Sequence, residues 1–141
     1  MVSPRQKGAI MTTWITICDT CKRDGWSAED DSATQAFTDG EKLAALIEAA
    51  AKSAAPPLPV KTRRHSCLMG CARACNVTIQ GAGKIAYTLG DFQPDDAVAT
   101  AILAYAQLHA SSATGQVPYR DWPQAVKGHF VTRHPPLPDQ E

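Results

Sequence analysis

The grouping of five cysteines into two short clusters most constrains what this chain can fold into. The first cluster is the C-x2-C pair Cys18 and Cys21, and the second is the run Cys67, Cys71 and Cys75. Short loops of this kind turn two sulfurs toward one centre, as a tetrahedral metal ion or a small iron–sulfur cluster requires. The fold is therefore expected to bring two distant loops together.

Metal or redox chemistry is favoured because we expect a protein without an export signal. The first ten residues lack the apolar segment of a secretory signal, and no apolar run approaches the roughly 18 to 20 residues of a membrane span. We expect a cytoplasmic protein, in which thiols stay reduced and structural disulfides are rare. An odd number of cysteines also cannot pair completely within one chain.

Charge and composition narrow the classes of partner. The chain has 141 residues, a length typical of one domain, and 14 basic side chains balance 14 acidic ones. A net charge of zero gives no electrostatic footprint for nucleic acid or an anionic membrane, so we expect neither as a partner. Leu, Ile, Val and Phe together number only 25 residues. Such a thin core would gain stability from a bound metal.

Apolar patterns predict a mixture of strands and helices. Residues 14–18 are β-branched and aromatic and predict a first strand that ends at a cysteine. Thr38 and Glu41 fit a capping box, which predicts a helix that runs to about Ser53. Further strands are predicted at residues 60–64, 77–80 and 84–89, and a second helix has Pro94 at its first position.

This order predicts an α/β fold of the thioredoxin-like type, with a four-stranded mixed sheet covered by two helices. Residues 11–112 are assigned to this domain. Residues 1–10 are expected to be a disordered lead-in, and residues 113–141 an irregular, Pro-rich C-terminal extension. Both cysteine clusters fall where a predicted strand gives way to a loop, so folding would bring them to one end of the sheet.

Metal binding competes with two other interpretations of the cysteines. Cys18 and Cys21 alone could form a redox dithiol, since C-x-x-C after a first strand is typical of thioredoxin-like oxidoreductases. Single cysteines also pack as small core residues, but five in two tight clusters seldom do. The 45 residues between the clusters disfavour a compact zinc ribbon. Several cations flank the cysteines and could dock an acidic partner, among them Arg63, Arg64 and Arg73.

The histidines carry less information. His65 precedes Cys67 by two residues and is expected to be solvated, with a ligand role as the alternative. His109 falls at the end of the second predicted helix, where it is expected to complement the helix dipole. The sequence has no G-x-S-x-G motif and no phosphate-binding loop, so it shows no sign of hydrolytic machinery.

Several short motifs carry a family resemblance. They are Cys-Leu-Met-Gly-Cys-Ala-Arg-Ala-Cys at 67–75, Gly83-Lys84, Tyr87, Gly90-Asp91, Gly-Gln-Val-Pro-Tyr-Arg at 115–120, and Trp122-Pro123. Over about residues 15–136 the chain resembles a bacterial family of small predicted metal-binding proteins that is often linked to cobalamin biosynthesis. The resemblance is most specific in the cysteines and in the Val-Pro-aromatic-Arg stretch.

The cysteine spacing is similar, more distantly, to that of the thioredoxin-like 2Fe-2S ferredoxins. Those proteins carry two cysteines near the first strand and a C-x3-C before a β-hairpin. Carried over by position, the resemblance implies four cluster ligands, Cys18, Cys21, Cys67 and Cys71. Cys75 stands where those ferredoxins tend to have proline, and it is the alternative ligand.

We therefore expect a 2Fe-2S protein that exchanges single electrons with a redox partner protein and is not itself an enzyme. The alternative is a zinc- or cobalt-binding metal-handling protein associated with cobalamin biosynthesis, which would use the same thiolates. Arg63, Arg64 and Arg73 are expected to dock the redox partner. An exposed sheet edge would also allow a homodimer.

Overall fold

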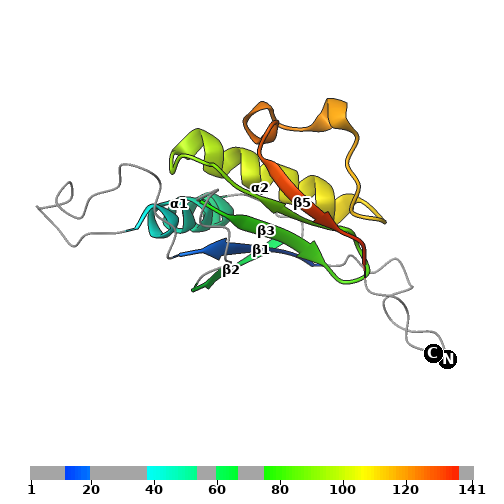
Figure 1. Cartoon of the computed structure of the whole chain (residues 1–141), viewed down its shortest axis with the longest axis horizontal. Helices are drawn as coiled ribbons and strands as arrows, with labels where there is room; N and C mark the ends of the chain where they lie inside the picture. Colours follow the sequence, from blue (N-terminus) through cyan, green and yellow to red (C-terminus); the bar gives the residue numbers. More distant parts are fainter. Residues whose placement is uncertain (1–11, 20–37, 54–59, 67–74, 137–141) are drawn as a thin grey trace, which may run out of the picture.

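The computed structural model describes residues 12–19, 38–53, 60–66 and 75–136. This part of the chain forms an α/β arrangement of one sheet and two α-helices (Figure 1). The strands are β1 (Thr13–Cys18), β2 (Val60–His65), β3 (Val77–Gly81), β4 (Ala86–Leu89) and β5 (Phe130–His134). The helices are α1 (Asp39–Ser53) and α2 (Asp96–Ser111), and two short 3-10 helices, η4 (Tyr119–Asp121) and η5 (Gln124–Val126), precede β5.

The sheet is mixed and has the strand order β2-β1-β3-β4-β5. β1 and β2 are parallel, with α1 between them in the chain, and every other neighbouring pair is antiparallel. This pattern is expected because parallel neighbours need a crossover connection, whereas a tight turn joins β3 to β4. β2 and β5 form the two edges of the sheet.

The core lies between the central strands and the two helices. α1 and α2 pack against each other and against β1 (Figure 1). Because side chains alternate along a strand, Ile15 and Ile17 share the helix-covered face of β1, and both are fully buried. Leu43 and Ile47 of α1 belong to the same buried cluster. The buried apolar side chains of these strands and helices thus lie in one layer between the sheet and the helices.

The capping box predicted at the start of the first helix is confirmed. The Glu41 amide donates to Thr38 Oγ1 at 3.0 Å, and the Thr38 amide donates to Glu41 Oε1 at 2.9 Å. These two bonds satisfy amides that helix geometry leaves without intrahelical partners. α1 ends at Ser53, as the sequence predicts.

The second helix begins later than predicted. Pro94 is not its first residue, because α2 starts at Asp96 and Asp95 is the N-cap. Asp95 has extended backbone geometry, and its carboxylate accepts the Val98 amide at 2.9 Å. A side-chain acceptor at the cap satisfies an orphan amide of the first turn, which proline cannot do.

The sheet has five strands, so the prediction of four is wrong. The additional strand, β5, lies in the segment that was expected to be irregular, and it pairs with β4. Its sequence, Phe-Val-Thr-Arg-His, has no alternation of apolar and polar residues. The register also shifts between Thr88 and Leu89. An exposed edge strand with an irregular register leaves little periodic signal in the sequence.

The environment of His109 differs from the expected one. The imidazole is fully buried. Its Nε2 donates to the Ile85 carbonyl at 2.7 Å, which fixes the tautomer, and its Nδ1 accepts from the Thr13 hydroxyl at 2.9 Å. The cation at the end of α2 is instead Lys84, whose ammonium donates to the carbonyls of His109 and Ala110. The dipole role predicted for His109 is therefore wrong.

Other expectations lie beyond what the structure tests. The lead-in at residues 1–10 falls outside the described residues. The division into a domain at 11–112 and an extension at 113–141 stays a prediction. Neither helix of the described part is long and apolar enough to cross a membrane.

Acid is expected to destabilise the fold through His109. Burial lowers the pKa of His109 from its ordinary value of 6.5, and the charge of Lys84 lowers it further. Between the folded pKa and 6.5 the unfolded chain binds more protons, so the free energy of unfolding falls as the pH falls through this window. One proton contributes a slope of up to about 1.4 kcal/mol per pH unit. Urea unfolding at pH values on both sides of 6.5 measures this slope.

Two glutamine variants test whether His109 causes this pH dependence of the free energy of unfolding. His109→Gln keeps one donor and one acceptor but does not titrate, so it should reduce the slope. His134→Gln makes the same substitution at an exposed histidine at the end of β5 and is the matched control. An unchanged slope in His109→Gln would show that another group carries the pH dependence.

Candidate metal centre

One cysteine of each predicted cluster lies at the same end of the sheet. Cys18 is the last residue of β1, and only 2% of its surface is exposed. Its amide donates to the carbonyl of Asn76 at 3.1 Å. The preceding residue, Cys75, is fully buried and belongs to the same core cluster as Cys18. The antiparallel pairing of β1 with β3 therefore joins the two cysteine-bearing segments.

The end of β2 lies beside this junction. His65, the last residue of β2, pairs with Cys18, and its carbonyl accepts the Asp19 amide at 3.1 Å. The His65 side chain is exposed, as expected for a solvated strand end. In the sequence, Cys67 follows His65 by two residues. The chain segments that carry Cys21 and Cys67 thus follow neighbouring strand ends in the sequence.

The first turn of α1 packs against the same strand end. The Thr38 hydroxyl donates to the Asp19 carbonyl at 2.5 Å, which ties the helix cap to the residue after Cys18. Gly40 is buried in this turn, and a Cβ there would collide with the Cys18 carbonyl oxygen. Glycine therefore permits the close approach. The positive end of the α1 dipole lies near the last residues of β1 as a result.

The remaining predicted ligands lie outside the described residues. These are Cys21, Cys67 and Cys71, and the same holds for Arg73 of the predicted docking patch. Among the residues that the structure describes, no three His, Cys, Asp or Glu side chains form a group that could hold a metal ion. The four-cysteine ligand set stays a prediction.

The two described arginines of the docking patch point to opposite faces of β2. The Arg64 guanidinium forms a two-pronged pair with Glu48 of α1, at 2.9 and 2.8 Å. The hydrogen bonds of this pair lower the pKa of Glu48 and raise that of Arg64. Arg63 Nε instead donates to Thr16 Oγ1 at 2.7 Å, on the face away from the helices. The structure therefore does not bring the two charges to one surface.

Arg63 belongs to a group that the sequence analysis did not assemble, here named the basic–aromatic patch and formed by Trp14, Lys61 and Arg63. Arg63 Cζ lies 5.6 Å and Lys61 Nζ 5.8 Å from the Trp14 ring centroid. Trp14 is 36% exposed. Local sequence shows, through strand alternation, that Trp14 and Cys18 share a face of β1. It does not show that Trp14 lies beside Lys61, because that pairing depends on the long-range register between β1 and β2.

Comparison with known proteins finds one family. The family model described as "Protein of unknown function (DUF1636)" matches residues 15–136. No curated protein and no solved structure matches the chain. The family description mentions neither cobalamin biosynthesis nor 2Fe-2S ferredoxins, so both links stay predictions from resemblance.

Gly40→Ala is expected to destabilise the protein. An alanine in place of a helical glycine ordinarily stabilises a protein by up to about 1 kcal/mol. Here the added methyl group meets the Cys18 carbonyl, so we expect a loss of about 1 to 3 kcal/mol in the free energy of unfolding. Urea unfolding measures the sign and the size of the change.

A helical position without such contact provides the control. Ala45 is exposed on α1, and Ala45→Gly should cost about 1 kcal/mol from helix propensity alone. If Gly40→Ala stabilised the protein while Ala45→Gly behaved as expected, the close approach of α1 to Cys18 would be refuted.

Proposed function

The chain belongs to the DUF1636 family of proteins of unknown function, and for this member we propose a 2Fe-2S electron-transfer protein. The proposed ligands are Cys18, Cys21, Cys67 and Cys71, with Cys75 as the alternative fourth ligand. The cluster exchanges single electrons with a partner protein. The proposal assigns no bond-making chemistry to the chain, which is therefore not an enzyme in this view.

The junction of Cys18 with the Cys75–Asn76 segment carries the proposal. In the sequence, Cys67 follows His65 by two residues and Cys21 follows Cys18 by three. His65 and Cys18 are themselves paired across β1 and β2. Four thiolates starting from these strand ends can converge on one small centre.

Local electrostatics also support a negatively charged centre. An oxidised 2Fe-2S cluster with four thiolates is an anion, and hydrogen bonds to its sulfurs together with burial set its potential. The positive end of α1 near Cys18 favours negative charge there. The Thr38 bond to Asp19 holds the helix in that position.

The thioredoxin-like assignment is part of the proposal and is supported by topology. The elements β1-α1-β2-β3-β4-α2 follow the predicted order, and β1 and β2 are parallel. The ferredoxins that the spacing resembles carry one cysteine pair near the first strand and another before a hairpin. Here Cys18 ends β1, and the C-x3-C of Cys67 and Cys71 precedes the hairpin of β3 and β4 in the sequence.

A zinc protein is the second candidate. The burial of Cys18 and Cys75 in a small core favours it, because a closed thiolate site contributes folding energy directly. The same cysteines would then serve a structural or metal-delivery role, and cobalt is the other metal this role would suit. Thiolate ligands are common to zinc and iron–sulfur centres. Colour separates the candidates, since a zinc site is colourless.

We assign the docking of an acidic redox partner to the basic–aromatic patch. Arg63 is fixed by Thr16 at 2.7 Å and reaches Gln80 Oε1 at 3.4 Å, so its charge is held on the open sheet face. Lys61 adds a second positive charge beside Trp14. Arg64, which was predicted to share this role, is already paired with Glu48. Long-range attraction by such a patch accelerates association at low salt.

Metal analysis after purification without oxygen tests the centre. We expect a brown protein with about two irons and two sulfides per chain, whose visible absorption bleaches on reduction. Serine at Cys18, Cys21, Cys67 or Cys71 should abolish the colour, and Cys75→Ser should retain it.

Each other outcome of this series has a defined meaning. If Cys71→Ser retained the colour and Cys75→Ser lost it, the fourth ligand would be Cys75 instead of Cys71. A colourless protein with one zinc would replace the cluster by the second candidate. A metal-free protein that turns over a disulfide substrate through Cys18 and Cys21 would overturn both.

Charge reversal tests the docking surface without a known partner. The reduced protein can be reoxidised by ferricyanide, an anion, or by hexaamminecobalt(III), a cation. Arg63→Glu should slow the first reaction severalfold and accelerate the second at low ionic strength, because the local potential changes sign. Arg120→Glu, an exposed η4 residue outside the patch, is the matched control. Equal effects of the two variants would show that only the net charge of the protein matters, and would refute a docking role for the patch.

A further inference from the structure

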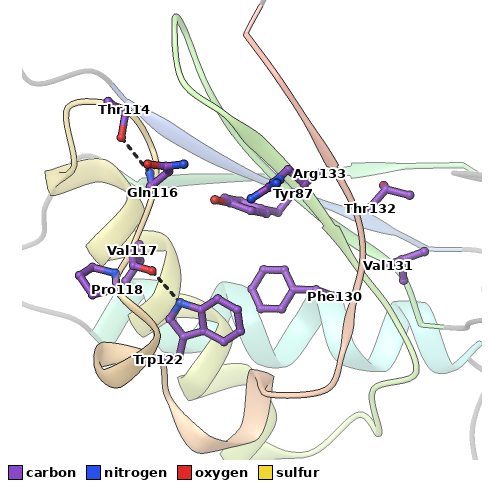
Figure 2. Close-up of a pocket in the computed structure, with 10 residues that line it drawn as sticks. All are labelled: Tyr87, Thr114, Gln116, Val117, Pro118, Trp122, Phe130, Val131, Thr132 and Arg133. Atoms are coloured by element: carbon purple, nitrogen blue, oxygen red, sulfur yellow. Dashed lines mark hydrogen bonds between the residues drawn. The ribbon is translucent and has the colours of Figure 1, made fainter.

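A pocket lies at the edge of the sheet opposite β2. Its volume is about 660 Å³, within the range of small-molecule sites. Figure 2 shows it between β4 and β5 on one side and the segment 114–118 with Trp122 on the other. None of its lining residues belongs to a cysteine cluster or to the basic–aromatic patch. The pocket is therefore a feature separate from the proposed metal centre.

Hydrogen bonds fix the wall formed by segment 114–118. The Ile85 amide donates to the Thr114 carbonyl at 2.9 Å, and Trp122 Nε1 donates to the Val117 carbonyl at 2.9 Å. Gly115 has a φ of 90°, and a Cβ there would lie 2.8 Å from the Ile85 carbonyl oxygen. The wall is thus packed on Ile85 and on the buried imidazole of His109. A preformed wall lowers the ordering cost of binding.

Aromatic rings form the apolar half of the pocket. The Phe130 ring lies 5.3 Å from Tyr87 at 83° and 4.5 Å from Trp122 at 31°, measured between centroids. The buried ring of Tyr105 supports Phe130 from behind, edge to face, at 5.4 Å. This surface offers ring contacts to a flat ligand.

The other half of the pocket is polar and carries positive charge. Arg133 pairs with Tyr87 across β4 and β5. Figure 2 shows the Tyr87 hydroxyl directed toward Gln116, with Arg133 beside Tyr87. Arg133 makes no ion pair with any residue that the structure describes, and the residues lining the pocket include no Asp or Glu. Its planar guanidinium matches the two oxygens of a carboxylate.

We propose that this pocket binds a small planar aromatic carboxylate. The ring lies against Trp122 and Phe130, and the carboxylate pairs with Arg133. A cation is the other ligand that clustered rings attract, but Arg133 would repel it and no lining carboxylate would neutralise it. A neutral aromatic ligand would displace water from the Arg133 guanidinium without supplying a negative charge in its place, which costs free energy.

The proposal gives a role to the motif at residues 115–123. Gly115 permits the close packing of the wall, and Val117, Pro118 and Trp122 line the pocket. The pocket does not depend on the identity of the metal, so its test is independent of the proposed function.

A nuclear magnetic resonance titration of the full chain with 2-naphthoate tests the site. Saturable shifts are expected at the Trp122 indole N–H and at the amides of residues 114–117 and 131–133. The neutral analogue 2-naphthalenemethanol should bind about tenfold more weakly, because the charged hydrogen bonds are lost. The cationic analogue 2-naphthylmethylamine should bind more weakly still.

Two arginine variants complete the test. Arg133→Gln, at an exposed position of an edge strand, should weaken naphthoate about tenfold and remove its advantage over the alcohol. Arg120→Gln makes the same charge change at an exposed position outside the pocket and should bind like the parent protein. Absence of saturation, shifts that map elsewhere, equal binding of the amine, or equal weakening in Arg120→Gln would each overturn the proposal.

Discussion

The hydrogen bonds of one buried imidazole connect parts of the molecule that are distant in the chain. His109 of α2 bonds to Thr13 at the start of β1 and to Ile85 just before β4. Its ring also lies against Gly115, which belongs to the wall of the pocket. A buried polar group without partners would cost free energy, so both bonds must form for these elements to pack together. The positions of β1 and of the pocket wall therefore depend on the same side chain.

The proposed metal centre and the pocket lie on different parts of the sheet. The cysteine end depends on β1, β2 and β3: Cys18 pairs with His65 of β2, and its amide donates to the carbonyl of Asn76, just before β3. The pocket depends on β4 and β5, at the opposite edge. Because they share no side chains, a ligand in the pocket and a metal at the cysteines would be coupled only through the packed layer between them.

Local signals in the sequence predicted much of the fold. The capping box of Thr38 and Glu41 needs only neighbouring residues, and the pattern of β1 is visible within six residues. The expectation that the clusters meet at one end of the sheet also followed from local reasoning, since each lies at a predicted strand boundary. It is supported for Cys18 and Cys75, the cysteines that the structure describes.

Features that depend on long-range pairing were missed. β5 joins the sheet through its register with β4, not through its own periodicity. The buried state of His109 depends on Thr13, which is 96 residues away. The basic–aromatic patch likewise needs the pairing of Trp14 with Lys61. A single sequence does not contain these registers in a form that local patterns reveal.

The pairing of Arg64 with Glu48 affects which register β2 adopts on β1. β2 is an edge strand whose side chains are all at least partly exposed, so burial alone discriminates weakly between adjacent alignments on β1. A slip by one residue would direct Arg63 toward α1 and Arg64 toward the open face. The pair is half exposed and therefore adds little to overall stability. Its larger effect is on the register of β2. The pair favours the alignment in which Arg64 lies beside α1 and Arg63 lies on the opposite, solvent-facing side of the strand.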